Sequence, residues 1–257
     1  MDLFGANKYN ICRFCISLHA KQTNIQRMKT VVFTGAGISA ESGLSTFRDS
    51  DGLWENYRVE DVCTHEAIER NRNMVIDFYN KRRQDAMKAQ PNAAHQAIAQ
   101  LEKHFEVEVI TQNIDDLHER AGSTHVTHLH GELMKLRSSK DESATVPITQ
   151  WEQPKDARHP DGSLLRPYIV FFGENVPNFP SAIEIVRTAD IFVVVGTSLA
   201  VYPAASLLAY VPKESPIYVV DPGEPDFGIY RNRVVHIKEK ASTGVPQLCK
   251  KLCKSHL

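Results

Sequence analysis

The chain of 257 residues has few cysteines, little net charge and no long apolar run. Each of these shortages excludes a class of protein. Five cysteines are an odd number that suits a reducing compartment better than a secreted disulfide scaffold. The 30 Lys and Arg nearly balance 31 Asp and Glu, so we expect no nucleic-acid partner. No apolar run approaches the roughly 18–20 residues of a membrane span. With 42% hydrophobic residues, the chain can nevertheless bury a sizeable core.

Residues 1–27 differ from the rest because they are basic and carry a single acid, Asp2. They show no firm helical or strand period. We interpret them as a flexible extension or as sequence upstream of the true start, since Met28 stands directly before the first convincing strand. The alternative is a mitochondrial presequence. We therefore expect a folded domain over 28–257 in a cytoplasmic protein, or a mitochondrial one under the alternative.

From Met28 onward, expected strands alternate with expected helices, which favours an α/β fold with a doubly wound, mostly parallel, Rossmann-like sheet. Near-continuous Val and Ile runs indicate strands that are buried on both faces. Segments 44–90 and 131–166 do not follow this alternation of strands and helices. We expect these two insertions to form a smaller lobe over the carboxyl edge of the sheet. Strands are expected at 30–34, 107–111, 126–129, 168–172, 191–195, 217–220 and 234–237, and helices at 75–88, 93–105, 115–121, 182–188, 204–210 and 245–252.

A glycine-rich turn follows the first expected strand. Gly35, Ala36, Gly37 and Ala40 give the pattern Gly-x-Gly-x-x-Ala, which seats a pyrophosphate on backbone N–H groups at the start of a helix. A Cβ at either glycine would keep the backbone away from the phosphates. A turn without a ligand is the alternative. Residues 44–54 are polar and lack the acidic strand end of a dehydrogenase, so hydride transfer is not expected.

Amide and carboxylate groups follow the second expected strand in Gln112-Asn113-Ile114-Asp115. Their directed hydrogen bonds suit a carboxamide, a ribose or a water. The alternative is that Asn113 or Asp115 caps the next helix. The turn Gly196-Thr197-Ser198 follows a later strand and suits nucleotide contacts, although it could equally be an ordinary capped turn.

His130 precedes Gly131 just after a short expected strand, where an imidazole can stand at a cleft. Its ordinary pKa lies near neutrality, so it can accept a proton from a hydroxyl. Four histidines lie between 118 and 130, but their spacing matches no standard metal motif and we expect no metal there.

Together these segments resemble the sirtuin family of NAD-dependent protein lysine deacylases. The resemblance covers essentially all of 28–257, and its motifs occur in the family's order. They are Gly35-Ala-Gly-Ile-Ser-Ala-Glu-Ser-Gly43, Thr46-Phe47-Arg48, Gln112-Asn113-Ile114-Asp115, His130-Gly131, Phe172-Gly173-Glu174 and Gly196-Thr197-Ser198.

The resemblance implies a role for each matched residue. His130 would be the general base, and Asn113 and Asp115 would act with it at the nicotinamide ribose and carboxamide. An acylated peptide would pair edge-on with Val170, Phe172 and Gly173, a mode that needs little side-chain specificity. The implied NAD contacts are Gly35, Ala36, Gly37, Ala40, Glu41, Thr46, Phe47, Arg48, Trp54, Gln112, Asn113, Ile114, Asp115, Gly196, Thr197, Ser198, Asp221 and Ala241.

The implied reaction breaks the nicotinamide–ribose bond and passes the acyl group to ADP-ribose, releasing free lysine. Two alternatives remain on the same scaffold. A mono-ADP-ribosyltransferase would modify a protein nucleophile instead, and a non-catalytic NAD sensor would be expected to lose His130 or Asn113. The implied partners are acylated protein substrates, with no membrane partner, and we expect a monomer.

Tyr79 and Arg82 lie at i and i+3, so both project from one face of the expected helix. A phenol and a guanidinium in an acyl pocket can bind a carboxylate. The Tyr-x-x-Arg pair resembles the subgroup that removes malonyl, succinyl and glutaryl groups, while acetyl-lysine would still be accepted. The alternative is a core tyrosine beside three solvated cations, Lys81, Arg82 and Arg83.

Most sirtuins carry two cysteine pairs in the small lobe that bind a structural zinc. The matching region 131–166 of this chain contains no cysteine, so we expect no zinc and a lobe that is held by packing. The four thiols of Cys12, Cys15, Cys249 and Cys253 could close a tetrahedral site only if the chain ends meet, which we do not expect.

Overall fold

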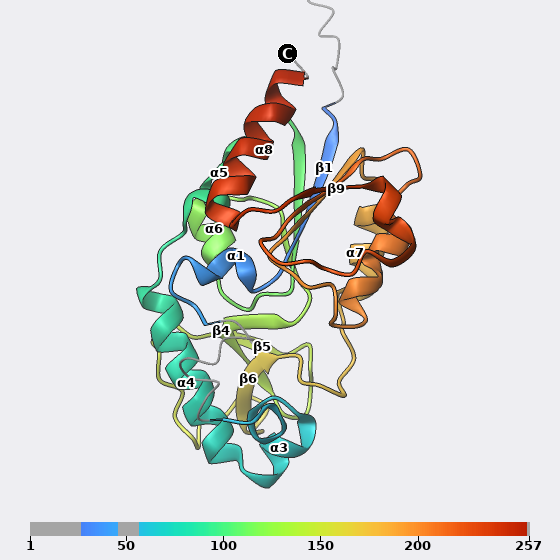
Figure 1. Cartoon of the computed structure of the whole chain (residues 1–257). Coiled ribbons are helices and arrows are strands. Elements are labelled where there is room, and N and C mark those ends of the chain that lie inside the picture. The colour runs from blue at the N-terminus through green and yellow to red at the C-terminus, as the bar shows by residue number, and fades with distance from the viewer. Residues whose placement is uncertain (1–26, 46–56, 256–257) are drawn as a thin grey trace, which may run out of the picture.

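Six parallel strands form the main sheet of the protein (Figure 1). We describe residues 27–45 and 57–255 of a computed structural model. The strand order is β3-β2-β1-β7-β8-β9, and every neighbouring pair is parallel. The expected doubly wound α/β sheet is thus confirmed. The strands are β1 Lys29–Thr34, β2 Glu106–Thr111, β3 Val126–His128, β7 Ile191–Val195, β8 Ile217–Val220 and β9 Val234–Ile237.

Helices cover both faces of this sheet because alternate residues of each strand are apolar on opposite sides. Val31 and Phe33 pack with one apolar cluster and Val32 packs with the other. Figure 1 shows α5, α6 and α8 on one face and α7 on the other. None of the described helices is long and apolar enough to cross a membrane. The bounds are α5 Ala93–Leu101, α6 Leu117–Ala121, α7 Phe179–Arg187, α8 Ala241–Ser255, and the 3₁₀ helices η2 Ala204–Tyr210 and η3 Gly228–Arg233.

A second, antiparallel sheet of three strands lies below the main sheet in Figure 1, in the order β5-β4-β6. The strand expected at 168–172 is wrong in position and partner, because β6 spans Leu165–Ile169 and pairs with β4 in this small sheet. The other two strands were not expected at all, namely β4 Gly131–Ser138 and β5 Thr145–Pro147.

The pattern of β4 was hard to read because its pairing is irregular. Its register with β6 shifts between Gly131 and Leu136, and a bulge of this kind breaks the alternation of apolar and polar residues. Gly131 itself has φ +87, and a Cβ there would lie 2.1 Å from the carbonyl oxygen of Tyr168. Only glycine therefore fits where the chain leaves His130 and enters the small sheet.

Helices from the other insertion pack against this small sheet. Helix α4 contacts both β4 and β6, and its Val75 and Phe78 share a buried cluster with Leu133 and Ile169. These two distant segments are therefore joined by one apolar core. The helices are α1 Gly37–Ala40, α2 Val59–Val62, α3 His65–Arg70 and α4 Arg72–Lys88.

All six expected helices differ from the structure in limits or in type, and α4, α7 and α8 each begin three or four residues earlier than expected. The helix expected at 93–105 ends at Leu101, and the one expected at 115–121 begins at Leu117. The segment 204–210 is a 3₁₀ helix, preceded by a cis Tyr202–Pro203 peptide bond. These differences lie at helix ends, where local hydrogen bonds decide the limits.

A group of hydroxyl and carboxylate side chains in the small lobe joins the buried Ser138 and Ser163 to the exposed Asp161. The hydroxyl of Ser138 lies 2.7 Å from a carboxylate oxygen of Asp161 and 2.8 Å from the hydroxyl of Ser163. It also accepts the N–H groups of residues 140 and 141. Trp151 is 41% exposed, so the lobe is not packed around it. The hydrogen bonds of Ser138 and the small apolar cluster of Leu136, Ile148 and Leu165 hold the lobe together.

Removing this hydroxyl should loosen the lobe. We expect Ser138→Ala to lower the Tm by about 1 to 6 °C, because it removes the hydrogen bond to the buried hydroxyl of Ser163, worth about 0.5–1.5 kcal/mol. Hydrogen bonds from Ser138 and Ser163 hold the pKa of Asp161 well below its ordinary value. A depressed carboxyl pKa stabilises the fold above the unfolded pKa of about 3.9 and is lost in acid. Asp161→Asn should therefore lower the Tm at pH 7 and lose that effect as the pH falls toward 3.

Calorimetry of both variants against pH tests this, with Asp156→Asn as the control. Asp156 is exposed in the same region and should leave the Tm unchanged. A Tm of Asp161→Asn equal to that of the wild type at pH 7 would contradict the role of the group.

Candidate functional site

The ends of β1, β2 and β7 meet at the carboxyl edge of the main sheet, and the turns that follow them carry most of the sequence-predicted site residues. Parallel strands place these turns side by side. Thr34, the last residue of β1, pairs with Thr111 of β2 on one side and with Val195 of β7 on the other. The glycine turn, the segment 112–115 and the turn 196–198 therefore share one edge.

The two glycine turns are packed directly against each other. The N–H of Gly35 donates to the carbonyl of Val195 at 3.0 Å, and that of Gly37 donates to the carbonyl of Gly196 at 2.8 Å. A Cβ on Gly37 would lie 2.7 Å from the Cα of Gly196. We expected that glycine is needed here so that phosphates can come close to the backbone. The structure shows that glycine is already needed so that the two turns can pack against each other. Helix α1, which begins at Gly37, is a single turn of four residues.

A hydrogen-bond network fixes the segment after β2. The amide nitrogen of Gln112 donates to the hydroxyl of Thr197 at 3.0 Å, which joins this segment to the second turn. Asn113 donates through Nδ2 to the hydroxyl of Ser39 at 3.1 Å, and Ser39 donates to Oδ2 of Asp115 at 3.1 Å. Side chains from three separate turns are thereby held in one arrangement.

The interpretation of Asp115 as a cap of the next helix is confirmed, while its contact with NAD stays a prediction. Its Oδ1 accepts the N–H of Leu117, the first residue of α6, at 3.2 Å, as a capping residue would. Its Oδ2 faces Ser39 in the network just described. Burial raises the pKa of Asp115, which is 8% exposed, and these two hydrogen bonds and the nearby charges of His128 and Arg82 lower it part of the way.

His130 is held in a single tautomer when its ring is neutral. Its Nδ1 lies 3.1 Å from the backbone carbonyl of Gln112. A carbonyl only accepts, so Nδ1 carries the hydrogen and Nε2 keeps a free lone pair. Burial lowers the pKa of His130, and the hydrogen bond to Gln112 opposes this. The ring is therefore neutral at neutral pH, as a general base must be.

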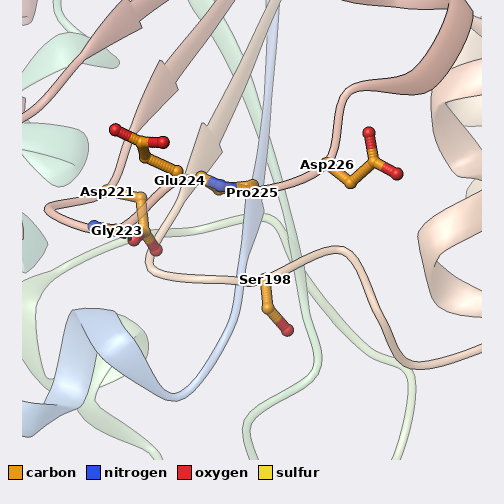
Figure 2. A pocket seen from close by; sticks show the side chains of 6 residues that line it. All are labelled: Ser198, Asp221, Gly223, Glu224, Pro225 and Asp226. Carbon is orange, nitrogen blue, oxygen red and sulfur yellow. Dashed lines mark hydrogen bonds between the residues drawn. The ribbon is translucent and has the colours of Figure 1, made fainter.

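A cavity of about 210 Å³ lies beside the turns that follow β7 and β8. Figure 2 shows Ser198 from one turn and Asp221 from the other among its lining residues, with Gly223, Glu224, Pro225 and Asp226 completing it. A carboxylate acceptor and a hydroxyl donor in one cavity suit the hydroxyls of a ribose. Of the predicted contacts of the adenosine half, Ser198 and Asp221 are thus brought together.

Three other predicted cofactor residues have structural uses. Both carboxylate oxygens of Glu41 accept hydrogen bonds from Ser242, at 3.0 Å from its N–H and 2.7 Å from its hydroxyl, so Glu41 binds the first turn of α8. Ala241 is 4% exposed and packs in the core below the sheet. The carbonyl of Ile114 accepts the N–H of Leu133 at 2.7 Å. Ala36 precedes the single-turn helix α1 and is half-buried, and Ala40 is the last residue of that helix and is exposed.

The predicted cofactor loop lies outside the described residues. It comprises Thr46, Phe47, Arg48 and Trp54, and Cys12 and Cys15 are also outside. Within the described part of the chain, no three His, Cys, Asp or Glu side chains gather as a metal site. The absence of zinc stays a prediction.

Tyr79 is a core residue whose hydroxyl has one close polar neighbour. It is 2% exposed, its ring lies 5.8 Å from that of Phe171, and its Oη lies 3.4 Å from Sγ of Cys63. Arg82, one turn later, is partly buried and donates to the carbonyl of Ser45 at 3.3 Å. Burial lowers the pKa of Arg82, while the nearby Tyr79 and Asp115 raise it.

The neighbouring cations do not behave alike. Lys81 is exposed and pairs with Asp85 at 3.1 Å, as the solvated alternative requires. Arg83, in contrast, has no exposed surface and donates to the carbonyls of Leu133 and Trp151. The interpretation of three solvated cations is therefore wrong for Arg83.

The segment Val170–Gly173 connects His130 to Cys63, the residue at the end of α2. The N–H of Val170 donates to the carbonyl of His130 at 3.0 Å, and that of Phe172 donates to the carbonyl of Cys63 at 2.8 Å. The N–H of Phe171 bonds Glu174 at 2.9 Å. The carbonyl of Phe171 accepts the N–H of Glu174 at 3.0 Å, so a peptide laid along this segment would have to meet its other carbonyl groups and Gly173. Phe172 is 49% exposed, which leaves its side chain open to a partner.

Sequence reasoning gave Glu174 no role, yet it anchors this segment. Its carboxylate accepts hydrogen bonds from Arg166 at 2.6 and 3.2 Å and from Arg137 at 3.3 Å. The guanidinium of Arg166 also lies 4.0 Å from the ring centroid of Phe171. The only signal in the sequence was the Phe-Gly-Glu motif, since Arg137 and Arg166 lie far from Glu174 in the chain.

Comparison with known proteins is consistent with this geometry. Residues 35–203 match the sequence profile of the Sir2 family. An NAD-dependent protein deacylase of Bacteroides thetaiotaomicron is 50% identical over 224 residues, which cover 85% of this chain and 95% of that protein. One of Aggregatibacter actinomycetemcomitans is 54% identical over 192 residues, covering 75% of this chain and 92% of the relative.

Solved structures with the same fold carry the expected type of ligand. A crystal structure of a Sir2 homologue with NAD superimposes with a TM-score of 0.81 and 37% identity, covering 90% of this chain and 91% of that one. A mutant Sir2 homologue with ADP-ribose gives a TM-score of 0.80 at 37% identity, covering 89% and 93%.

Proposed function

Because this chain belongs to the Sir2 family and is an NAD-dependent protein deacylase, we propose that it prefers malonyl and succinyl groups on protein lysine and also accepts acetyl groups. The observation that carries the class of reaction is His130, neutral and with Nε2 free, joined through Gln112 to the network of Asn113 and Asp115. The predicted products are nicotinamide, free lysine and O-acyl-ADP-ribose.

The carboxyl edge of the sheet fits NAD. The cavity of Ser198 and Asp221 offers a hydroxyl and a carboxylate to a ribose, and the network of Asn113 and Asp115 offers an amide and a carboxylate one turn away. We propose that the first pair holds the adenosine half and the second the nicotinamide half. The two packed glycine turns between them would present backbone groups to the pyrophosphate.

The chain's own groups can carry the proton movements of the reaction. When bound, NAD would supply the ribose carbon to which the acyl oxygen bonds as nicotinamide leaves, and water would then allow the free lysine to be released. The Nε2 atom of His130 accepts a proton from a ribose hydroxyl, and the carbonyl of Gln112 keeps the opposite nitrogen protonated and the ring oriented. Asp115, whose carboxylate oxygens accept hydrogen bonds from Ser39 and from the N–H of Leu117, holds the ribose.

The preference for acidic acyl groups rests on Arg82 and Tyr79. Arg82 is a partly buried guanidinium whose charge acts on Tyr79, Cys63 and Asp115, so it lies among the groups that flank the site. A guanidinium binds a carboxylate by charge-assisted hydrogen bonds. We propose that the Tyr79 hydroxyl turns from its weak thiol partner at Cys63 to the same carboxylate.

The acylated lysine would arrive on a peptide that pairs with the segment Val170–Gly173, which Glu174 holds in place. We propose protein substrates in extended conformation, a monomeric enzyme and a cytoplasmic location, with a mitochondrial location as the alternative. No membrane or nucleic-acid partner is proposed.

The runner-up functions are less consistent with the same residues. A mono-ADP-ribosyltransferase would have no use for a Tyr79–Arg82 pair beside the site. A non-catalytic NAD sensor would not need His130 in a base-competent tautomer. Fold analogy alone would not separate the three.

Product analysis separates them. The full chain is incubated with NAD and a succinyl-lysine peptide, and the products are identified by mass spectrometry. Nicotinamide, the free peptide and O-succinyl-ADP-ribose are expected. A mass increase of ADP-ribose on a protein side chain would favour the transferase, and NAD binding without consumption would favour the sensor. Malonyl and acetyl peptides in the same experiment define the preference.

A further inference from the structure

His128 lies directly behind the segment 113–115 and is not used in the proposed reaction. It is the last residue of β3, is 7% exposed and pairs in register with Thr111 of β2. Its Nδ1 lies 2.8 Å from the backbone carbonyl of Asn113, and its Nε2 lies 2.7 Å from Oε1 of Glu119 on α6. One ring therefore joins the cofactor segment to the helix that follows it.

The two partners determine the charge of this ring. A backbone carbonyl and a carboxylate only accept hydrogen bonds, so each ring nitrogen must carry a hydrogen to make both bonds. The ring is then an imidazolium, paired with the carboxylate of Glu119. His130, two residues later, bonds through Nδ1 to a single carbonyl and has no carboxylate partner of this kind. Neighbouring histidines are therefore set in opposite states.

We propose that the His128–Glu119 pair is a positioning device, which holds the segment 113–115 for the nicotinamide end of NAD only while His128 carries both protons. This rests on the proposed function and deepens it. His128 touches no reacting atom. It acts through the carbonyl of Asn113 and through its positive charge, which helps to keep the buried carboxylate of Asp115 ionised.

Charged and titratable groups from each neighbouring element bear on this ring. Hydrogen bonding and charge from Glu119 outweigh burial and raise the pKa of His128 above its ordinary value of about 6.5, and Glu132 on β4 adds to the rise. The charge of His128 lowers the pKa of Asp115 and of His118, and the charge of Lys135 lowers the pKa of Glu119. Burial alone lowers the pKa of His130.

Activity should therefore lie in a pH window that two histidines define. As the pH rises, His130 loses its proton first and becomes a base. At higher pH, His128 loses its own proton, gives up one of its two hydrogen bonds and releases the segment 113–115. The acid limb of a bell-shaped profile would belong to His130 and the alkaline limb to His128.

The variant Glu119→Gln tests this because it keeps an acceptor for Nε2 and removes the charge. The kcat/KM for NAD is measured from pH 6 to pH 10 in the wild type and the variant. We expect the alkaline limb to move to lower pH, the acid limb to stay, and the KM for NAD above neutral pH to rise about 10-fold with a smaller change in kcat. Glu132→Gln is the control, since it removes a nearby charge but no hydrogen bond to His128, and it should shift the limb far less.

A second measurement does not depend on activity. The ring nitrogens of His128 are titrated by NMR in ¹⁵N-histidine-labelled protein, with the signals assigned by loss in His128→Gln. We expect His128 to titrate above its ordinary pKa and to move downward in Glu119→Gln. An unmoved alkaline limb and KM, an equal shift in Glu132→Gln, or an ordinary titration of His128 would overturn the proposal. Failure of the proposed function would appear differently, as a wild type that does not consume NAD.

Discussion

His130→Ala should reduce turnover by about 10²- to 10⁴-fold and leave the affinity for NAD largely unchanged. General-base catalysis contributes an effect of this size. Nε2 of His130 is the free imidazole nitrogen, while Nδ1 bonds the backbone carbonyl of Gln112. The NAD contacts proposed for Asn113, Asp115 and Asp221 do not depend on that ring. Steady-state kinetics with a succinyl peptide give the loss, and isothermal titration with NAD gives the affinity.

A matched substitution shows that the loss is specific. His125 lies on the same stretch of chain, is exposed and bonds the hydroxyl of Thr124 at 2.9 Å, so His125→Ala should retain normal turnover. If His130→Ala turned over NAD at nearly the wild-type rate, His130 would not be the base. If it lost NAD binding altogether, its role would be structural.

The main sheet was predictable because its signal is local. Residues 191–195 are apolar throughout, and only a strand buried on both faces needs such a run. The small sheet was not predictable, since β4 carries a bulge between Gly131 and Leu136 and alternates poorly. A bulge is set by the partner strand, which sequence inspection does not supply.

The site was predictable in its residues and less so in its contacts. Motif order indicated His130, Asn113 and Asp115. The structure joins Asn113 and Asp115 through Ser39 and bonds His130 to the carbonyl of Gln112. Arg83 was misjudged because it stands beside two other cations and looks solvated. Its burial depends on carbonyl groups at 133 and 151, which only the folded chain brings near. The reason for Gly37 was likewise hidden in Gly196, far along the sequence.

Arg82→Met should lower kcat/KM for succinyl and malonyl peptides by about 10- to 150-fold and leave the value for acetyl peptide within a few-fold of the wild type. The range corresponds to loss of one charge-assisted hydrogen bond of roughly 1.5–3 kcal/mol. Methionine keeps much of the length and apolar stem of arginine, so the pocket should not collapse. Parallel assays of the three peptides at fixed NAD concentration give the ratio directly.

Further substitutions at positions 81 and 82 of α4 test whether the effect is specific to the guanidinium of Arg82. Lys81→Met removes an exposed cation that pairs with Asp85 and should leave the acyl preference unchanged. Arg82→Lys keeps the charge but not the planar fork, so it should recover only part of the succinyl activity. Equal losses on acetyl and succinyl peptides in Arg82→Met would mean that Arg82 supports the site as a whole, through Asp115 or the carbonyl of Ser45, and not the acyl carboxylate. A selective loss, in contrast, requires that the substrate itself supply the negative charge that Arg82 binds.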